Sequence, residues 1–199
     1  MIRDWSSSLR WLRKRSFGVG VVYQELAEPA LEAAISTKTV AIHIGIEGKR
    51  MEFALENLAK VRREIEPLLE QHWQEIALNK DIIKMNPDWE GYARLDNVNA
   101  LRIYTARKDD VMMGYFVVIV SKSLHYRDHL FANNDVIFLT KPARKGLTGV
   151  KLIKFAIESL AAEGITKLHV NTKAHQPFDA ILERLNFEEI ERVYSLVLR

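Results

Sequence analysis

The sequence predicts an α/β protein in which helices flank a mixed β-sheet. Two observations lead to this class. Residues 101–107 and 112–120 read as strands joined by the turn Lys108-Asp109-Asp110, which is typical of a β-hairpin. Residues 149–162 then carry apolar side chains at helical spacing and are followed by Gly164, a common helix stop. Strand-like and helix-like runs alternate from there on, so the sheet is expected to be mixed.

The same patterns define the other elements in order along the chain. The predicted strands are 51–58, 101–107, 112–120, 135–139, 167–171 and 193–198, and the predicted helices are 59–78, 149–162 and 177–185. Pro67 lies inside the first helix and marks a kink or a break there. Residues 79–99 are expected to form a polar connector between that helix and the hairpin.

The first fifty residues differ in composition from the rest. Five basic residues against Asp4 give the first twenty residues a net charge of +4. Residues 25–36 resemble a short helix and residues 39–46 a strand. We therefore divide the chain into an appendage, residues 1–50, and a domain, residues 51–199. The appendage is either loosely structured or a basic, Trp-bearing arm that contacts a membrane surface or a polyanion.

Composition excludes several classes of function. The chain has no cysteine, which rules out disulfides, thiolate metal sites and a cysteine nucleophile and fits a reducing, cytoplasmic location. Its six histidines lack the His-Glu-x-x-His spacing of zinc hydrolases, so no metal is expected. The sequence contains no run of eighteen apolar residues, so no membrane span is expected. A net charge of +3 does not by itself indicate a nucleic-acid binder.

The turn over residues 141–149 is the most informative stretch. It lies between an apolar run and a predicted helix, and it contains Arg144, Lys145, Gly146 and Gly149. Free N–H groups at a helix N-terminus, with basic side chains beside them, suit a phosphate or pyrophosphate. Such a turn is equally ordinary punctuation between a strand and a helix. The spacings of nucleoside triphosphate P-loops and of dinucleotide-binding loops are absent.

This turn and the element order resemble the GNAT superfamily of acyl-CoA-dependent N-acyltransferases. Its signature is Arg/Gln-x-x-Gly-x-Gly/Ala, and Arg144 and Gly149 match the first and last positions. Leu147 stands where the middle glycine is expected, and Gly146 lies one residue earlier. The resemblance covers residues 51–199 and implies a central mixed sheet of the GNAT kind.

The closing part of the chain carries the resemblance further. Residues 180–187 are similar to the superfamily's Tyr-Glu-Lys-Leu-Gly-Phe run, with Leu182 at the tyrosine and Asn186 at the glycine. The chain looks most like GNAT proteins of tailed bacteriophages and their bacterial relatives. The segments that carry this likeness are 72–77, 124–127, 135–139 and 146–153.

The resemblance implies an acetyl-CoA-dependent N-acetyltransferase that acts on an unidentified amine, in a protein or a small molecule. It implies that the backbone of Leu139 and Thr140 pairs with the pantetheine arm. The residues expected to hold the pyrophosphate are Arg144, Lys145, Gly146, Leu147, Thr148 and Gly149. The alternative is a GNAT-fold module that has lost catalysis, such as a phage structural or host-interaction protein.

Acyl transfer to an amine needs a general base and an acid for the leaving thiolate. Asp135 is the first candidate for the base, although it would equally well orient the loop beside it. His125 is the next candidate, whereas His72 lies on an apolar helix stripe and is expected in the core. Tyr194, Tyr115 or a water would replace the missing tyrosine at Leu182, unless the thiolate leaves unprotonated. The residues expected to contact the acceptor are Trp89, Glu90, Tyr92 and Tyr126.

The place where the resemblance begins, Met51, suggests a further hypothesis. The native chain would start there, and the upstream segment would reflect the choice of start site. Intact-mass measurement of the native protein tests this, since a mass that includes residue 1 contradicts it. If the protein is phage-encoded, the expected location is the host cytoplasm.

Overall fold

The computed structural model describes residues 50–198. The predictions for residues 1–49, namely the helix, the strand and the basic arm, lie outside this range. The elements in order are β1 (Met51–Glu56), α1 (Leu58–Ile76), α2 (Trp89–Asn97), β2 (Leu101–Lys108), β3 (Val111–Lys122), β4 (Leu130–Leu139), η4 (Lys141–Arg144), α3 (Thr148–Ala162), β5 (Lys167–His169) and α4 (Asp179–Arg184).

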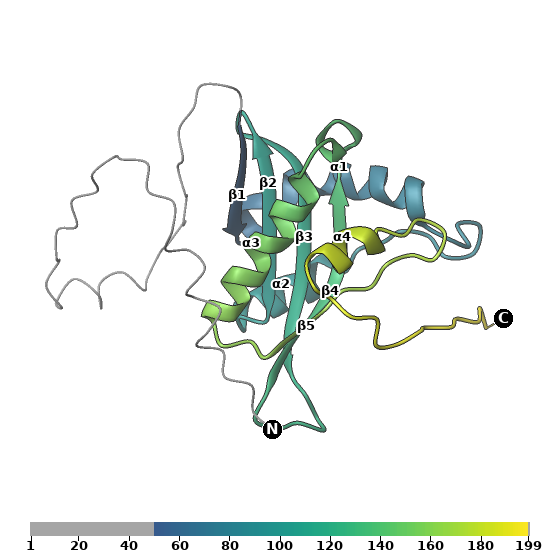
Figure 1. Cartoon of the computed structure of the whole chain (residues 1–199). Helices are drawn as coiled ribbons and strands as arrows, with labels where there is room; N and C mark the ends of the chain where they lie inside the picture. Colours follow the sequence, from purple (N-terminus) through teal and green to yellow (C-terminus); the bar gives the residue numbers. More distant parts are fainter. Residues whose placement is uncertain (1–49, 199) are drawn as a thin grey trace, which may run out of the picture. The chain divides into compact units, whose positions relative to one another are not determined.

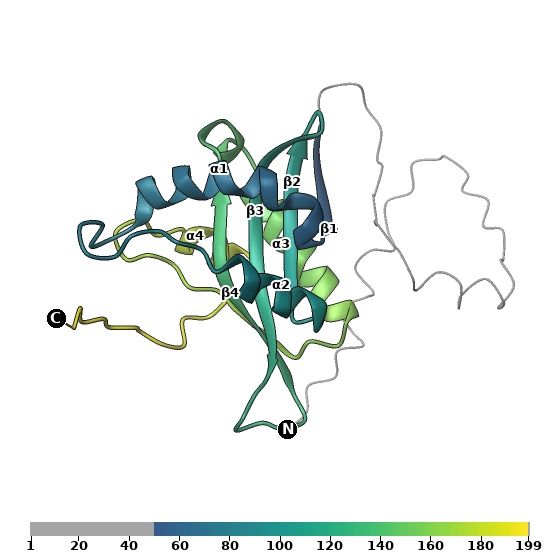
Figure 2. The same cartoon turned by 180° about the vertical axis from the view of Figure 1, so that it is seen from behind.

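The predicted mixed sheet is confirmed. Its five strands lie in the order β1-β2-β3-β4-β5, the first four antiparallel and β5 parallel to β4. Helices α3 and α4 lie on one face (Figure 1), and α1 and α2 lie on the other (Figure 2). A sheet covered on both faces buries two separate layers of apolar side chains.

The two layers follow from the alternation of side chains along β2 and β3. Ile103, Tyr115 and Val117 face α1 and α2 and form one buried cluster. Tyr104, Phe116 and Val118 face α3 and form the other. Neighbouring residues of one strand thus serve opposite cores, which explains why residues 115–120 of β3 form a continuous apolar run.

Helix α1 forms over nearly the predicted range. The Asn57 side chain accepts a hydrogen bond from the Lys60 N–H at 3.0 Å and caps the first turn. The buried residues Leu58, Val61, Ile65, Leu68 and His72 recur at helical spacing. Pro67 is exposed inside an unbroken helix, so the predicted break does not occur.

The predicted hairpin is also confirmed. Asp109 and Asp110 connect β2 to β3 with φ of 53° and 63°. Two residues in the left-handed region give a turn whose twist matches that of the strands. Aspartate tolerates this conformation better than most residues with a side chain.

Helix α2 corrects the prediction of a connector over 79–99. The Asp88 side chain accepts a hydrogen bond from the Gly91 N–H at 2.8 Å, and nine helical residues follow. Gly91 lowers the helical propensity of so short a segment, and none of its residues is fully buried. Asp88, which caps the helix, was the sequence signal from which α2 could have been predicted.

The predicted final strand over 193–198 is wrong, because these residues form no strand in the structure. Their side chains are largely exposed. A strand requires a neighbour for its backbone groups, and sequence pattern alone does not supply one.

Candidate functional site

The sheet opens between β4 and β5. β5 pairs with β4 only from Phe131 to Asn133, although β4 continues to Leu139. Beyond that point the chain departs from β4, as Figure 1 shows. Two polar contacts hold the start of the opening: Asn133 Oδ1 lies 2.9 Å from His169 Nδ1, and the Asn171 N–H donates to Asn134 Oδ1 at 2.6 Å. Past these contacts, β4 has a backbone edge that no described strand covers.

The N-terminus of α3 lies at the far end of this edge. Leu147 precedes the helix without any side-chain capping bond, and the first turn contains no acidic residue. The first N–H groups of the helix are therefore available to an anion. Gly146 has a φ of +73°, with open space where a side chain would be. Leu147 has a φ of −107°, which any residue adopts, so a leucine is tolerated here.

Gly149 holds the first turn of α3 close to its neighbours. A side-chain carbon at this position would lie 3.5 Å from Ile181 of α4 and 3.6 Å from Leu139 of β4. These are ordinary contact distances, so a methyl group fits here. The helix N-terminus is thus packed between the end of β4 and α4.

Arg144 bridges β4 and α1. Its Nε donates to the Leu139 carbonyl at 2.8 Å, and its Nη2 donates to Glu75 Oε2 at 2.6 Å. The guanidinium also lies 5.3 Å from the ring centre of Phe138. Arg144 therefore occupies the last carbonyl of the β4 edge. Glu75 lies in segment 72–77, which carries part of the resemblance, but no sequence signal identifies it as the partner of Arg144.

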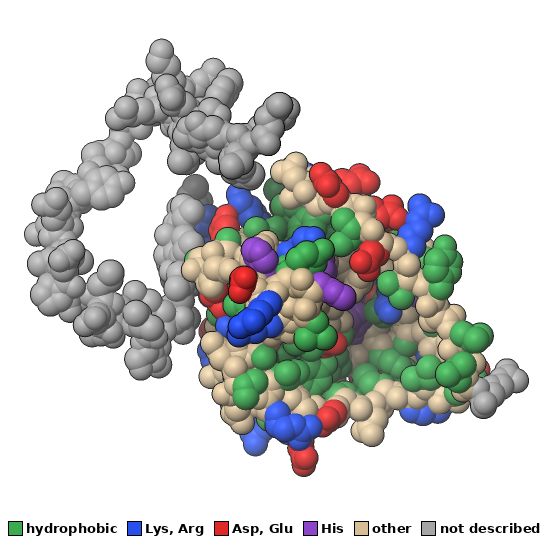
Figure 3. All heavy atoms as spheres, turned by 90° about the horizontal axis from the view of Figure 1, so that it is seen from below, with side chains coloured by type: hydrophobic (Ala, Val, Ile, Leu, Met, Phe, Trp, Pro, Cys, Tyr) green, Lys and Arg blue, Asp and Glu red, His purple; other side chains and the backbone are tan. Residues whose placement is uncertain are grey.

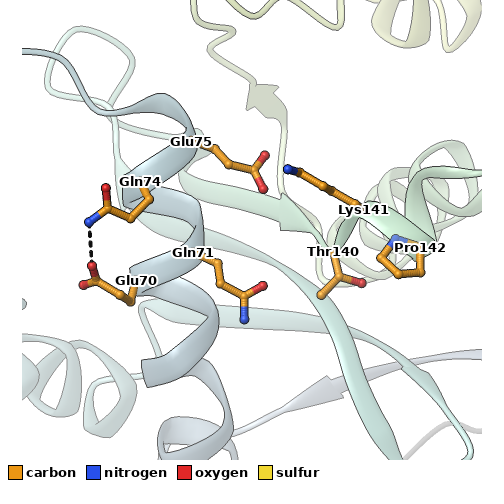
Figure 4. A pocket seen from close by; sticks show the side chains of 7 residues that line it. All are labelled: Glu70, Gln71, Gln74, Glu75, Thr140, Lys141 and Pro142. Atoms are coloured by element: carbon orange, nitrogen blue, oxygen red, sulfur yellow. Dashed lines mark hydrogen bonds between the residues drawn. The ribbon is translucent and has the colours of Figure 1, made fainter.

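A cavity of about 480 Å³ lies beside this ion pair. It is lined by Glu70, Gln71, Gln74, Glu75, Thr140, Lys141 and Pro142. Figure 4 shows the side chains of Glu75 and Lys141 directed toward one another across it. The hydroxyl of Thr140 is buried without a hydrogen-bond partner, although hydroxyls in that position are usually paired.

Asp135 lies at an irregularity in β4. Val117 pairs with Val136 and Val118 pairs with Asn134, so Asp135 is the extra residue of a β-bulge. The bulge turns Asp135 to the same face as Val136, where its Oδ2 accepts a hydrogen bond from the Tyr92 hydroxyl of α2. The structure thus brings together the predicted base and one predicted acceptor residue. Burial and the Asp135 carboxylate raise the pKa of Tyr92, which therefore keeps its proton.

His72 and Tyr115 form a second pair nearby. His72 Nδ1 lies 3.1 Å from the Tyr115 hydroxyl, and the imidazole stacks on Phe138 with ring centres 5.0 Å apart. Burial lowers the pKa of His72 to about 4, so the ring is neutral at pH 7. Burial also raises the pKa of Tyr115, with a smaller effect from Tyr92. The expectation that His72 is a core histidine is confirmed, since it is buried.

The other predicted residues are not gathered at this point. His125 and Tyr126 lie in the exposed loop that precedes β4, and Asp135 lies a further five residues into that strand, about 17 Å from its first residue. Tyr194 is 88% exposed near the end of the chain. Trp89 packs partly into the core under the guanidinium of Arg62, and Glu90 of α2 is exposed.

Two departures from the superfamily pattern have structural explanations. Leu182 is buried in α4 and serves packing, so it supplies no hydroxyl. Asn186 has a φ of 62° just after α4, the left-handed conformation that glycine usually provides at a helix end. Asparagine adopts it more readily than most residues do.

Residues 50–198 contain no group of three or more histidine or acidic side chains that could hold a metal ion. No helix in this range is both long and apolar enough to cross a membrane.

No family model matches the sequence, and no curated protein matches it. Solved structures do match its fold. An aminoglycoside acetyltransferase from an uncultured soil metagenomic sample has a TM-score of 0.58 at 15% identity, covering 75% of this chain and 97% of that chain. The ribosomal-protein-alanine N-acetyltransferase of Brucella melitensis biovar Abortus has a TM-score of 0.55 at 21% identity, with coverage of 75% and 99%. A predicted acetyltransferase of Clostridium acetobutylicum, solved with acetyl-CoA, has a TM-score of 0.57 at 9% identity, with coverage of 74% and 96%. The fold of residues 50–198 is therefore that of the GNAT acetyltransferases, as the sequence predicted.

Proposed function

We propose that this protein is an acyl-CoA-dependent N-acyltransferase that uses acetyl-CoA and an amine acceptor. One observation carries the proposal: the uncovered edge of β4 leads directly to the open N-terminus of α3. An uncovered strand edge suits a ligand with amide groups, and a helix N-terminus suits phosphates. The pantetheine and pyrophosphate parts of CoA present these two chemistries in sequence.

The residues present fit such a ligand. The N–H groups of Thr148 and Gly149, with the charges of Arg144 and Lys145, would hold the phosphates. The open space at Gly146 allows close approach to the backbone. Leu139 and Thr140 end the β4 edge, where the pantetheine amides would pair. Arg144 must release the Leu139 carbonyl for that pairing, and a phosphate would compete with Glu75 for its guanidinium.

We assign the role of general base to Asp135. The acceptor nitrogen attacks the thioester carbonyl, its proton passes to the Asp135 carboxylate, and the carbon–sulfur bond breaks to release thiolate. Tyr92 acts as a positioning residue, because its hydroxyl holds one carboxylate oxygen and leaves the other for the amine. Water reaches this exposed carboxylate and can relay the proton onward.

The leaving thiolate has no evident tyrosine acid. Leu182 occupies the usual position, and Tyr194 is exposed near the chain end. Tyr115 is buried against His72, and its raised pKa makes it a poor proton donor. We therefore propose that the thiolate leaves unprotonated or takes its proton from water.

The acceptor is proposed only as an amine. One similar structure is an aminoglycoside acetyltransferase and another a ribosomal-protein-alanine N-acetyltransferase, so the shared fold does not select between small-molecule and protein acceptors. The likeness to phage GNAT proteins rests on the sequence segments given above. We therefore include a phage origin in the proposal, and with it a location in the host cytoplasm.

The test has two steps. Isothermal titration with CoA and acetyl-CoA should show binding, and its absence at millimolar ligand would reject the proposal. Thiol release from acetyl-CoA should then be measured with pools of small amines, polyamines and peptides. Comparing acetylated proteins and metabolites in cells with and without the protein would identify the acceptor.

A second candidate function is a CoA-binding module without catalysis. The buried Leu182 and the exposed Tyr194 favour it, because neither offers an acid next to Asp135. Binding of CoA without thiol release from any acceptor pool would support this alternative over the enzyme.

A further inference from the structure

Arg144 occupies a backbone group that the proposed ligand would need. Its Nε donates to the Leu139 carbonyl at 2.8 Å, at the end of the uncovered β4 edge. Its Nη2 donates to Glu75 of α1 at 2.6 Å, and the guanidinium lies on the ring of Phe138. Contacts with three different residues hold the guanidinium in one position, although 41% of the side chain is exposed. In the structure, this arginine is therefore engaged at the place where CoA is proposed to bind.

The last turn of α1 keeps Glu75 in place. His175 Nε2 lies 3.1 Å from the Ile76 carbonyl, and the Gln176 side chain donates to the Glu75 carbonyl at 3.5 Å. The loop between β5 and α4 thus fastens the end of α1. The Glu75 side chain itself is 21% exposed. Because its backbone is held, this carboxylate cannot move far with Arg144, so the ion pair must break when the guanidinium turns toward a ligand.

A second cation lies beside the same carboxylate. Lys141 begins η4, three residues before Arg144, and its side chain is directed toward Glu75 across the cavity (Figure 4). In the structure, Glu75 pairs with Arg144. When Arg144 leaves, Lys141 can pair with Glu75, so the half-buried carboxylate keeps a cation. Two cations beside one carboxylate thus allow two alternative pairings.

The charge of the wider surface does not replace these local contacts. Among the residues that the structure describes, Lys and Arg side chains on the face seen in Figure 3 are interspersed with Asp and Glu. The net charge of the chain is +3 at pH 7. Charges of both signs, mixed in this way, give a weak field at a distance. The binding of phosphates therefore depends on the cations of the site itself and on whether they are free.

We propose that Glu75 and Lys141 regulate access to the CoA site through Arg144. Without ligand, Glu75 holds Arg144 on the Leu139 carbonyl. When a phosphate takes the guanidinium, Lys141 becomes the partner of Glu75, and the carbonyl becomes free for an amide of the ligand. Glu75 and Lys141 are positioning residues, since each acts through Arg144. This regulation rests on the proposed binding of CoA.

The two parts of CoA should respond oppositely to Arg144→Ala. Pantetheine has the amides without the phosphates, so Arg144 only competes with it for the Leu139 carbonyl. Removing the side chain should lower the Kd of pantetheine about threefold or more, and it should raise the Kd of CoA, which loses a phosphate partner. Titration calorimetry with both ligands measures the two effects. An unchanged or weaker binding of pantetheine overturns the proposal.

Glu75→Gln tests the ion pair while Arg144 is present. The amide keeps the shape of the side chain but holds Arg144 less firmly, so the Kd of CoA should fall about threefold or more. Glu70→Gln is the matched control, because Glu70 lines the same cavity and accepts a hydrogen bond from Gln74. It removes the same charge and should leave the Kd nearly unchanged.

The calorimetry separates this regulation from the proposed function. If Glu75→Gln binds CoA no more tightly than Glu70→Gln does, the regulation is wrong, although the protein binds CoA. If neither the parent nor Glu75→Gln binds CoA, the proposed function is rejected and the regulation with it. Binding by Glu75→Gln alone would support both, because the ion pair would then be what excludes the ligand from the parent.

Lys141→Gln tests the exchange of partners. In the parent, the Kd of CoA should rise about threefold, because Glu75 is left without a cation when Arg144 moves away. In the Glu75→Gln background the same change should have a much smaller effect, since no carboxylate remains to be paired. An equal loss of affinity in both backgrounds would mean that Lys141 contacts the phosphates directly, and it would overturn the exchange.

Discussion

His72 is a buried histidine whose charge state ties stability to pH. Burial lowers its pKa from 6.5 to about 4, while Glu75 opposes and Arg144 assists that shift. Between these values the unfolded chain binds a proton that the folded chain does not, so the free energy of unfolding must fall as pH falls. We expect a loss of about 2 kcal/mol from His72 between about pH 7.5 and about pH 5.

Urea unfolding at the two pH values measures this effect. His72→Gln keeps a polar group beside Tyr115 but does not titrate, so its stability should change less over the same interval. Carboxylates such as Glu56 contribute little in this range. Burial alone would raise the pKa of Glu56, but hydrogen bonds from Lys60, Thr105 and Arg107 lower it overall. An unchanged pH dependence in His72→Gln would contradict the assignment.

Asp135 is the residue on which the proposed chemistry depends. Asp135→Asn keeps the shape of the side chain but cannot take a proton, so kcat should fall by about 10²–10⁴-fold. Binding of CoA should be unchanged, because this residue lies away from α3. Tyr92→Phe should reduce kcat by a smaller factor, since it removes only the hydrogen bond that orients the carboxylate. Thiol release at saturating acetyl-CoA measures both, and full activity of Asp135→Asn would reassign the base.

The contact between Asp135 and Tyr92 could be predicted from the sequence only in part. Asp135 could be chosen from its place near the start of a predicted strand, and Tyr92 as an aromatic beside an acid. Their hydrogen bond spans 43 residues and depends on a bulge that turns Asp135 toward α2. A sequence pattern does not specify that extra residue, because the flanking apolar runs read the same with or without it.

At the scale of elements, the junction of β4 with α3 governs the proposed binding of CoA. Gly149→Glu adds a negative charge and bulk beside the first turn of α3, so CoA affinity should fall by at least ~1.4 kcal/mol, roughly tenfold. Gly149→Ala is the matched control, because a methyl group makes only ordinary contacts there. Arg144→Ala should weaken binding less, and more visibly at low salt, since its charge is partly exposed. Titration calorimetry of the three variants decides, and equal affinity in Gly149→Glu rejects the phosphate site.

The pairing of β3 with β4 depends on Gly114. A side-chain carbon there would lie 2.9 Å from the Leu139 Cα, in a backbone that cannot move aside freely. Gly114→Ala should therefore cost about 1–3 kcal/mol of stability. Because it displaces the end of β4, it should weaken CoA binding as well. Urea unfolding of Gly114→Ala, compared with that of Gly149→Ala, measures this loss. Equal stabilities of the two variants would contradict it.

Elements with a strong hydrophobic periodicity could be predicted from the sequence, whereas elements with a weak periodicity could not. Helices α1 and α3 and the β2–β3 hairpin have buried faces or turn residues that the sequence displays. Helix α2 has no fully buried residue, and its short amphipathic face resembles a loop. Residues 193–198 have the composition of a strand, but the sequence pattern does not reveal whether a neighbouring strand is there to pair with them.

The order of elements is a property of the whole molecule, and it could be predicted because each strand and helix leaves a local signal. The opening between β4 and β5 could not, since it results from how early β5 ends relative to β4. Register between strands distant in sequence is set by packing that only the folded sheet provides. The site is thus a consequence of topology more than of any one motif.

Binding of CoA should stabilise the whole domain. A ligand that binds only the folded state contributes about 2.7 kcal/mol at a concentration one hundred times its Kd. For a chain of this size, this corresponds to a rise in Tm of roughly 5–10 °C.

Differential scanning calorimetry with CoA, and with pantetheine at the same concentration, separates the two halves of the site. Pantetheine lacks the phosphates, so it should raise Tm much less if the N-terminus of α3 carries the binding. The rise with CoA should shrink in Gly149→Glu and persist in Gly149→Ala. An equal rise with both ligands would assign binding to the β4 edge alone, and no rise with CoA would contradict the site altogether.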